Sequence, residues 1–254
     1  MGKRHSIAAK KAAGDANKAK MYSKIGKQIQ LAAKKGADPS MNPQLELMLQ
    51  KAKYHNLPRD VVDKAIKKGS GQLKSEDLQE IVYEGYGPGG VALVIKALSD
   101  NVNRTAPNIK TILGKRGGAL GEPGSVIWQF NENGVIVVNG TYEMVNEKGN
   151  TVKKITPLDQ DAFEEYALEL DILDIEFEGE GADQVAIITT SKDAFAEVKT
   201  QLENEKYNLT DAELHYIAGN TLTLSDEDSE KLAELVADLE EDEDVDNVYH
   251  NQAE

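Results

Sequence analysis

The chain has 254 residues, enough for one large hydrophobic core or for two to three small ones. It contains no cysteine, which excludes disulfides and thiolate chemistry and is typical of a reducing cytosol. Its mean hydropathy is -0.50, and no run of about eighteen apolar residues occurs, so the sequence predicts no membrane span. No apolar segment follows Lys3 and Arg4, and we therefore expect a cytoplasmic protein without a secretory signal.

Charge is divided unevenly along the chain, whose formal net charge is -15. Residues 1–74 hold seventeen Lys and Arg against five Asp and Glu, a net charge of +12. The other 180 residues hold 12 basic and 39 acidic side chains, a net charge of -27. This division predicts a first segment that binds a polyanion and an acidic body that is solvated or binds a partner. The alternative is a basic helical face that only balances the acidic body.

Three short amphipathic helices are expected in the basic segment after a flexible arm at residues 1–14. Capping residues and apolar spacing place them at 15–35, 43–55 and 59–69. The first helix has an apolar stripe for the core and an opposite face that we expect to meet water or phosphate. The cations of that opposite face are Lys20, Lys24, Lys27, Lys34 and Lys35.

Strands and helices alternate in the acidic body. Strands are expected at 91–98, 125–130, 134–138, 172–177, 184–190, 212–217 and 245–250, and helices at 101–115, 159–170, 193–205 and 225–239. The order of elements from 134 to 217 is that of a ferredoxin-like unit, and 91–130 completed by 225–250 gives the same order.

The expected fold class is therefore α+β, with an N-terminal three-helix bundle followed by two ferredoxin-like domains, one inserted in the other. We place the basic helical domain at 1–74, the split domain at 75–132 plus 219–254, and the inserted domain at 133–218.

A loop of four glycines and one proline lies between two apolar runs. Gly85-x-Gly87-x-x-Gly90 matches the dinucleotide fingerprint by letter, but a strand follows where that fingerprint needs a helix, so we reject a dinucleotide site. The glycines serve either tight turn geometry or a bare loop that approaches a ligand, with flanking tyrosines that could stack on bases. The candidate contact residues are Tyr83, Gly85, Tyr86, Gly87, Pro88, Gly89 and Gly90.

Arg104 falls in the first turn of a predicted helix, where a cation opposes the helix dipole, and this position indicates an anionic partner. The four histidines are scattered without metal-ligand spacing, and no nucleophile signature occurs. We therefore expect no enzyme, no cofactor and no metal.

Four ordered motifs resemble the YebC/PmpR family, and the resemblance covers essentially the whole chain. They are YEGYGPGG at 83–90, DN-x-NRT at 100–105, KRGG-x-LGE-x-GSV-x-W-x-F at 115–130 and DVDNVYHN at 244–251. The resemblance implies a helical N-terminal domain, two α+β domains and DNA-binding transcriptional regulation in the bacterial cytoplasm. Some members, and the mitochondrial relatives that activate translation of cytochrome oxidase, instead resemble ribosome-associated factors that relieve stalled elongation, for instance at proline runs.

This sequence departs from the family pattern in its arm. Ile7-Ala8 stand where the family commonly has Lys-Trp, so a stacking aromatic is missing, and Asp246 stands where glutamine is common.

We therefore predict a non-enzymatic, monomeric regulator that binds nucleic acid. The predicted contact residues are Lys3, Arg4, Lys10, Lys11, Lys20, Lys24, Lys27, Lys34, Lys35 and Arg104. DNA and ribosomal RNA, with the ribosome itself as a partner, stay open as targets. Few base-reading side chains lie in the basic segment, which favours contact with a phosphate backbone. A protein-interaction module that uses the acidic body is the second alternative.

Overall fold

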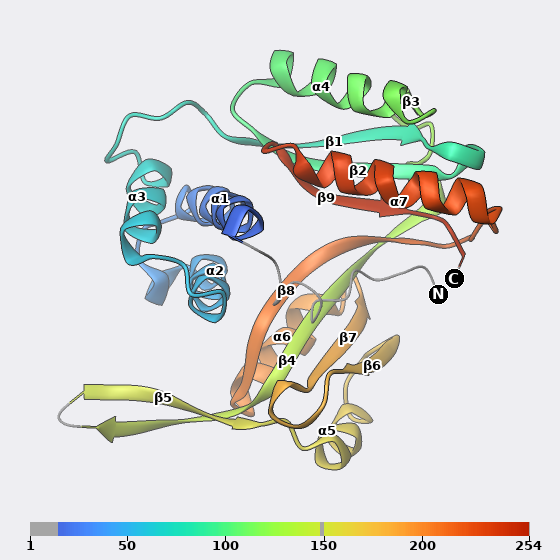
Figure 1. Cartoon of the computed structure of the whole chain (residues 1–254). Helices are drawn as coiled ribbons and strands as arrows, with labels where there is room; N and C mark the ends of the chain where they lie inside the picture. The colour runs from blue at the N-terminus through green and yellow to red at the C-terminus, as the bar shows by residue number, and fades with distance from the viewer. Residues whose placement is uncertain (1–14, 148–149, 254) are drawn as a thin grey trace. The chain divides into compact units, whose positions relative to one another are not determined.

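The computed structural model describes residues 15–147 and 150–253 (Figure 1). They form two compact units: the described residues up to Asn131 together with those from Tyr216 onwards, and the residues Glu132–His215. The predicted arm at 1–14, with Lys3, Arg4, Lys10 and Lys11, lies outside the described residues. Within the part described, no helix combines the length and the apolar character needed to cross a membrane.

Three helices open the first unit, as the sequence predicted. They are α1 (Asp15–Ala33), α2 (Pro43–Tyr54) and α3 (Arg59–Gly69), with a short 3-10 turn, η2 (Pro39–Met41), before α2. The side chain of Asn42 accepts a hydrogen bond from Leu45 N and so caps α2.

Helices α1 and α3 approach closely at one glycine. A Cβ placed on Gly69 would lie 2.1 Å from Gln30 O and 2.7 Å from Ala33 Cβ. Gly69 therefore serves the packing of the two helices, because no side chain fits between their backbones at this point.

The first sheet lies in the same unit and contains β1 (Gln79–Tyr86), β2 (Ala92–Ser99), β3 (Ala119–Leu120) and β9 (Val245–His250). Its order is β3-β1-β2-β9, and each neighbouring pair is antiparallel. This is the strand order of a ferredoxin-like sheet. The position that the third strand of that fold occupies is taken here by β1, which comes first along the chain. Helices α4 (Val102–Lys115) and α7 (Asp226–Glu241) pack against one face (Figure 1).

Strand β2 is buried on both sides, which explains its nearly continuous apolar sequence. Leu93 and Ile95 face a core that includes Leu113 of α4 and Leu235 of α7. The alternate residues Ala92 and Val94 contact Val126 and Phe130 on the other face.

The strand predicted at 125–130 is wrong. This stretch is a loop with a 3-10 turn, η4 (Ile127–Gln129). The carboxylate of Glu84 accepts hydrogen bonds from Val126 N and Ile127 N, at 2.7 and 2.8 Å, so these groups are not available to a strand ladder.

The second unit contains another ferredoxin-like sheet. Its elements are β4 (Phe130–Glu147), β5 (Asn150–Pro157), α5 (Gln160–Ala167), β6 (Asp174–Glu178), β7 (Val185–Ser191), α6 (Phe195–Asn204) and β8 (Tyr207–Ala218). The order is β5-β4-β7-β6, and β8 also pairs with β4. Strand β5 was not predicted from the sequence. Without it, the order β8-β4-β7-β6 is that of the ferredoxin-like fold. The predicted α+β class, with one such sheet inserted in the other, is confirmed.

The chain leaves the first unit and returns to it at neighbouring points. Gly219 N donates to Gln129 O at 2.8 Å. A backbone hydrogen bond thus joins the two segments that flank the inserted unit.

Candidate nucleic-acid interface

The lysine face of α1 meets acidic groups of the chain itself. Lys27 Nζ lies 2.8 Å from Asp244 Oδ1 and also donates to Glu243 O and Leu98 O. Lys24 Nζ donates to Asp246 O at 3.4 Å. The prediction that this face is turned to water or phosphate is therefore wrong for Lys24 and Lys27.

The remaining predicted lysines of α1 also have partners. Lys20 Nζ lies 3.5 Å from a carboxylate oxygen of Glu241, and Lys34 contacts Asp77 and donates to Leu78 O. Lys35 donates to the side chain of Gln44 at 3.1 Å and forms no ion pair with a described residue. Any role of these lysines in nucleic-acid binding stays a prediction.

Asp244 is the centre of this contact. Its buried carboxylate accepts hydrogen bonds from Lys27 Nζ, Arg104 Nη2, Thr105 Oγ1 and Ser99 Oγ, at 2.8, 2.8, 2.8 and 3.2 Å. Burial raises the pKa of Asp244, but the hydrogen bonds from Lys27, Arg104 and Thr105 outweigh that effect and bring the pKa to about 2. Two of the recognised motifs, at 100–105 and 244–251, therefore meet at one structural ion cluster.

Arg104 finds its anions within the protein. Its guanidinium contacts both carboxylate oxygens of Asp244 and lies 2.9 Å from Asp100 Oδ1. The anionic partner that its position at the start of α4 indicated is thus supplied in part by the chain itself.

The glycine loop is packed against the first unit. Pro88 is buried, and a Cβ on Gly87 would lie 2.8 Å from Val91 Cγ1. Gly89 has φ +67°, and a Cβ there would lie 2.7 Å from Leu224 Cδ2, just before α7. These contacts favour the turn interpretation of the glycines over a bare loop that approaches a ligand.

The two tyrosines beside the loop have different surroundings. Tyr83 packs against the core between the sheet, α4 and α7. Tyr86 is 39% exposed, and its hydroxyl donates to Ser125 O at 3.1 Å. Only Tyr86 is therefore placed to stack on a ligand.

Trp128 was not among the predicted site residues. It is 71% exposed, and its Nε1 donates to the same oxygen, Ser125 O, at 3.1 Å. It falls within the strand that the sequence predicted at 125–130. Two features of the sequence could have identified Trp128: it is the single tryptophan of the chain, and it follows a segment rich in glycine.

The loop of Trp128 is organised by Glu84. Its carboxylate accepts hydrogen bonds from Gly124 N, Val126 N and Ile127 N, at 2.6, 2.7 and 2.8 Å. Burial raises the pKa of Glu84, but the hydrogen bonds from the three N–H groups together lower it by more. The net pKa of Glu84 therefore lies below the usual value. The side chain is therefore held as an ionised acceptor.

Several cations of the helical segment have no ion pair within the described ranges: Lys53, Arg59, Lys64, Lys67, Lys68 and Lys74. Lys64, Lys67 and Lys68 are neighbours on α3, one turn after Asp60 and Asp63. We call the group Lys64, Lys67, Lys68 and Lys74 the α3 basic surface.

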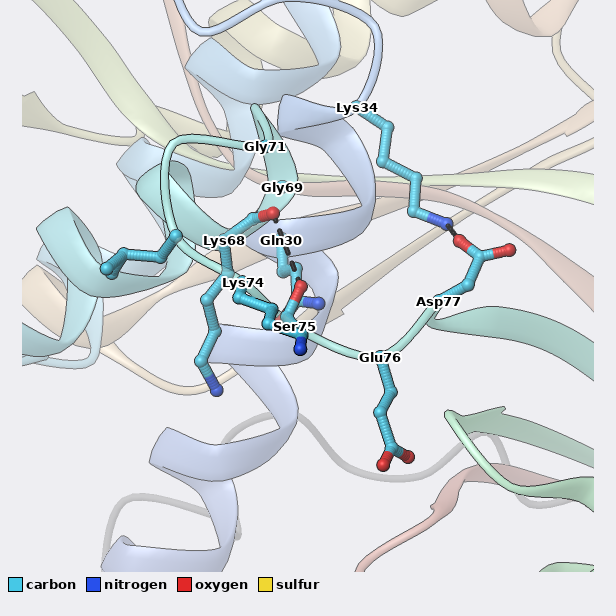
Figure 2. A pocket seen from close by; sticks show the side chains of 10 residues that line it. Gln30, Lys34, Lys68, Gly69, Gly71, Lys74, Ser75, Glu76 and Asp77 are labelled. Carbon is cyan, nitrogen blue, oxygen red and sulfur yellow. Dashed lines mark hydrogen bonds and ion pairs between the residues drawn. The ribbon is translucent and has the colours of Figure 1, made fainter.

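A groove of about 450 Å³ connects part of this surface with α1 (Figure 2). Lys68 and Lys74 line it, together with Gln30, Ser75 and the ion pair of Lys34 with Asp77. Glu76 also lines the groove, so it combines unpaired cations with acidic neighbours.

The cations of the body are mostly paired. The pairs are Lys96–Glu80, Arg104–Asp244, Arg116 with Glu234 and Asp238, Lys154–Glu143, Lys192–Glu132, Lys199–Glu203 and Lys231–Glu227. Lys110, Lys115 and Lys206 form no ion pair with a residue that the structure describes.

A helical segment followed by two ferredoxin-like units, one inserted in the other, is an architecture shared with known proteins. Residues 2–72 match the family model for the TACO1/YebC protein N-terminal domain, and residues 78–252 match that for the TACO1/YebC second and third domain. The chain therefore belongs to the TACO1/YebC family, which confirms the resemblance drawn from the four motifs.

Individual relatives agree over nearly the full length. A "Probable transcriptional regulatory protein" of Thermoanaerobacter pseudethanolicus is 40% identical over 247 residues, covering 97% of this chain and 93% of that protein. One of Clostridium tetani is 38% identical over 248 residues, covering 97% and 94%. The crystal structure of a conserved hypothetical protein from Aquifex aeolicus has a TM-score of 0.78 at 33% identity, covering 94% of this chain and 91% of that one.

Proposed function

We propose that this protein is a regulator that acts by binding nucleic acid, with phosphate contacts made by the α3 basic surface. The observation that carries the proposal is the distribution of unpaired cations. They gather on the helical segment, whereas the cations of the acidic body are mostly neutralised by ion pairs. Unpaired cations can release counterions from a polyanion, which supplies most of the affinity in non-specific binding.

The proposal modifies the site predicted from the sequence. Lys27 and Arg104 would have to leave the carboxylate of Asp244 before they could contact phosphate, and Lys24 would have to leave its hydrogen bond to Asp246 O. Lys64, Lys67 and Lys68 need no such exchange. We therefore assign the first contacts to α3 and keep the α1 lysines as secondary candidates.

Duplex DNA is the target that the names of the relatives support, since these are called probable transcriptional regulatory proteins. Ribosomal RNA is the alternative target. Binding of the full chain to labelled duplex DNA, to a labelled RNA hairpin and to sedimented ribosomes, in parallel at one salt concentration, separates the two. Tighter binding to ribosomes than to any duplex would reject the DNA assignment.

The α3 basic surface is tested by charge-matched variants. Lys64, Lys67 and Lys68, changed together to Gln, should reduce the slope of log K against log salt by about 2 to 3 units on DNA, at about 0.9 per lost phosphate contact. The control changes Lys110, Lys115 and Lys206 to Gln, which alters net charge equally but should leave the slope unchanged. Equal losses in both variants would show that only overall charge matters.

A further inference from the structure

One carbonyl oxygen holds two aromatic side chains at the surface of the first unit. Tyr86 Oη and Trp128 Nε1 each donate to Ser125 O, at 3.1 Å. A carbonyl oxygen has two lone pairs and can accept both bonds. The polar ends of the two rings are thus fixed at one point, while much of each side chain stays in contact with water.

The backbone that carries the rings is fixed from two sides. The carboxylate of Glu84 binds three N–H groups of the loop, as described above. Tyr86 pairs with Ala119 of β3, and Gly121 N donates to Glu84 O at 2.8 Å. Trp128 is therefore exposed by an ordered loop, although burial of an indole would stabilise the fold.

We propose that Tyr86 and Trp128 form a stacking platform for an unpaired nucleobase. The inference rests on the proposed nucleic-acid binding and adds a second point of contact. A base offers a flat π face to aromatic side chains whatever its identity. Bases within a duplex are already stacked on their neighbours, so the platform selects a single strand, a loop or a flipped base.

The surroundings of the platform favour a base over an apolar protein surface. Among the described residues of the first unit, the other exposed large apolar side chains lie on other elements: η2, the segment after α3 and the start of α4 carry Met41, Leu73 and Val102. A protein partner needs a broad patch that excludes water around its central contacts, whereas two rings suffice for one base.

Charge near the platform also fits a base. Its loop carries Glu122, and Lys115 ends α4, the helix that precedes β3 and this loop. Charge of both signs favours contact with the uncharged face of a base over contact with a phosphate backbone. Phosphate contact is left to the α3 basic surface.

Trp128 is the single tryptophan of the chain, so its fluorescence reports on the platform directly. The eight residues of β1 span about 25 Å, at about 3.3 Å per residue. Tyr86 ends this strand, so a probe that also reaches the segment after α3 must be long. We suggest 3′-labelled single strands of about 20 nucleotides, one RNA and one DNA of the same sequence. Anisotropy of the label measures binding, and Trp128 emission measures stacking.

The full chain should show a saturable decrease in Trp128 emission with the same midpoint as the anisotropy change. Heparin, a polyanion without bases, should bind without changing the emission, and a duplex of the same sequence should change it little. Whichever of RNA and DNA gives the larger decrease identifies the source of the base.

Variants separate stacking from a general apolar contact. Trp128→Ala and Trp128→Leu should each lower the affinity for the single strand about tenfold, since stacking is lost in both. Tyr86→Phe keeps the ring and should bind within about threefold of the wild type, since stacking is kept. Leu168→Ala removes another exposed apolar side chain, in the second unit, and should leave the affinity unchanged.

Binding by anisotropy without a change in Trp128 emission would overturn the platform and leave the proposed function intact. Wild-type affinity of Trp128→Leu, or equal quenching by duplex and single strand, would also overturn it. Absence of any anisotropy change with RNA and DNA would overturn the platform and the proposed function together.

Discussion

Lys27 of α1 and Asp244, just before β9, form a 2.8 Å ion pair although 217 residues separate them in the sequence. Asp244 is also held by Arg104 of α4 and by Ser99 at the end of β2. One carboxylate thus joins the helical segment to three elements of the first sheet and its helices. Its neighbours provide the first two predictions.

Lys27→Met should destabilise the first unit by about 2 kcal/mol, because it removes one cation from a buried carboxylate that keeps Arg104 and Thr105. Urea unfolding followed by Trp128 fluorescence measures the change. Lys231→Met is the control, since Lys231 pairs with Glu227 at an exposed site and should change stability by less than about 0.5 kcal/mol. Equal effects of the two substitutions would contradict a central role of the Lys27 pair.

Asp244→Asn should remove one component of acid sensitivity. The pKa of Asp244 is lowered to about 2 in the folded protein, so its stabilising effect is fully present above the unfolded pKa of about 3.9. The effect is lost as the pH falls through the folded pKa, and it amounts to on the order of 2 kcal/mol.

The measurement is the difference in unfolding free energy between wild type and Asp244→Asn at pH 7, 4 and 2.5. We expect the wild type to be more stable at pH 7 and 4, with the difference decreasing at pH 2.5. A difference that stays constant across this range would mean that Asp244 does not titrate in the way its contacts imply.

Glu84→Gln should loosen the loop that carries Trp128. The amide offers one oxygen acceptor where the carboxylate offers two, so at least one of the three N–H groups loses its partner, at a cost of about 1 to 3 kcal/mol. Fluorescence anisotropy of Trp128 should fall, and acrylamide quenching should rise. Glu122→Gln, on the exposed part of the same loop, should leave both readings unchanged.

Gly69→Ala should destabilise the helical segment by about 1 to 3 kcal/mol, because the new Cβ meets the backbone of α1 at Gln30. Gly114→Ala is the matched control within α4, where a Cβ meets nothing within 4 Å. It should stabilise by up to about 1 kcal/mol through helix propensity. Circular dichroism melts of both variants test the contrast, and a neutral Gly69→Ala would show that α1 and α3 can separate at this point.

Sequence patterns of short range predicted most of the elements. Apolar periodicity and capping residues located α1, α2 and α3. The helix predicted at 225–239 is α7, and Ser225 caps it. Strand β5 could not be predicted from such patterns, because it carries adjacent lysines at 153 and 154 and shows no apolar alternation.

Such patterns could not predict contacts between residues that are far apart in the sequence. The periodicity of α1 defined a lysine face correctly, but it could not show that this face meets Glu241, Asp244 and Asp246 near the other end of the chain. The apolar run at 125–130 looked like a strand because its pattern fits one. Its use as a loop depends on Glu84, about 40 residues earlier, and only the fold reveals that pairing.

The hydrogen bond between Gly219 N and Gln129 O has a consequence for synthesis on the ribosome. The inserted unit is complete in sequence at His215. The first unit is not complete at that point, because its sheet still lacks β9 and its core still lacks Leu232 and Leu235 of α7. The inner unit can therefore fold while its host still lacks a strand and a helix. Once it has folded, its closely spaced ends bring the late C-terminal segment back to the β1–β2 hairpin made earlier, which lowers the entropy cost of closing the host around a long insertion.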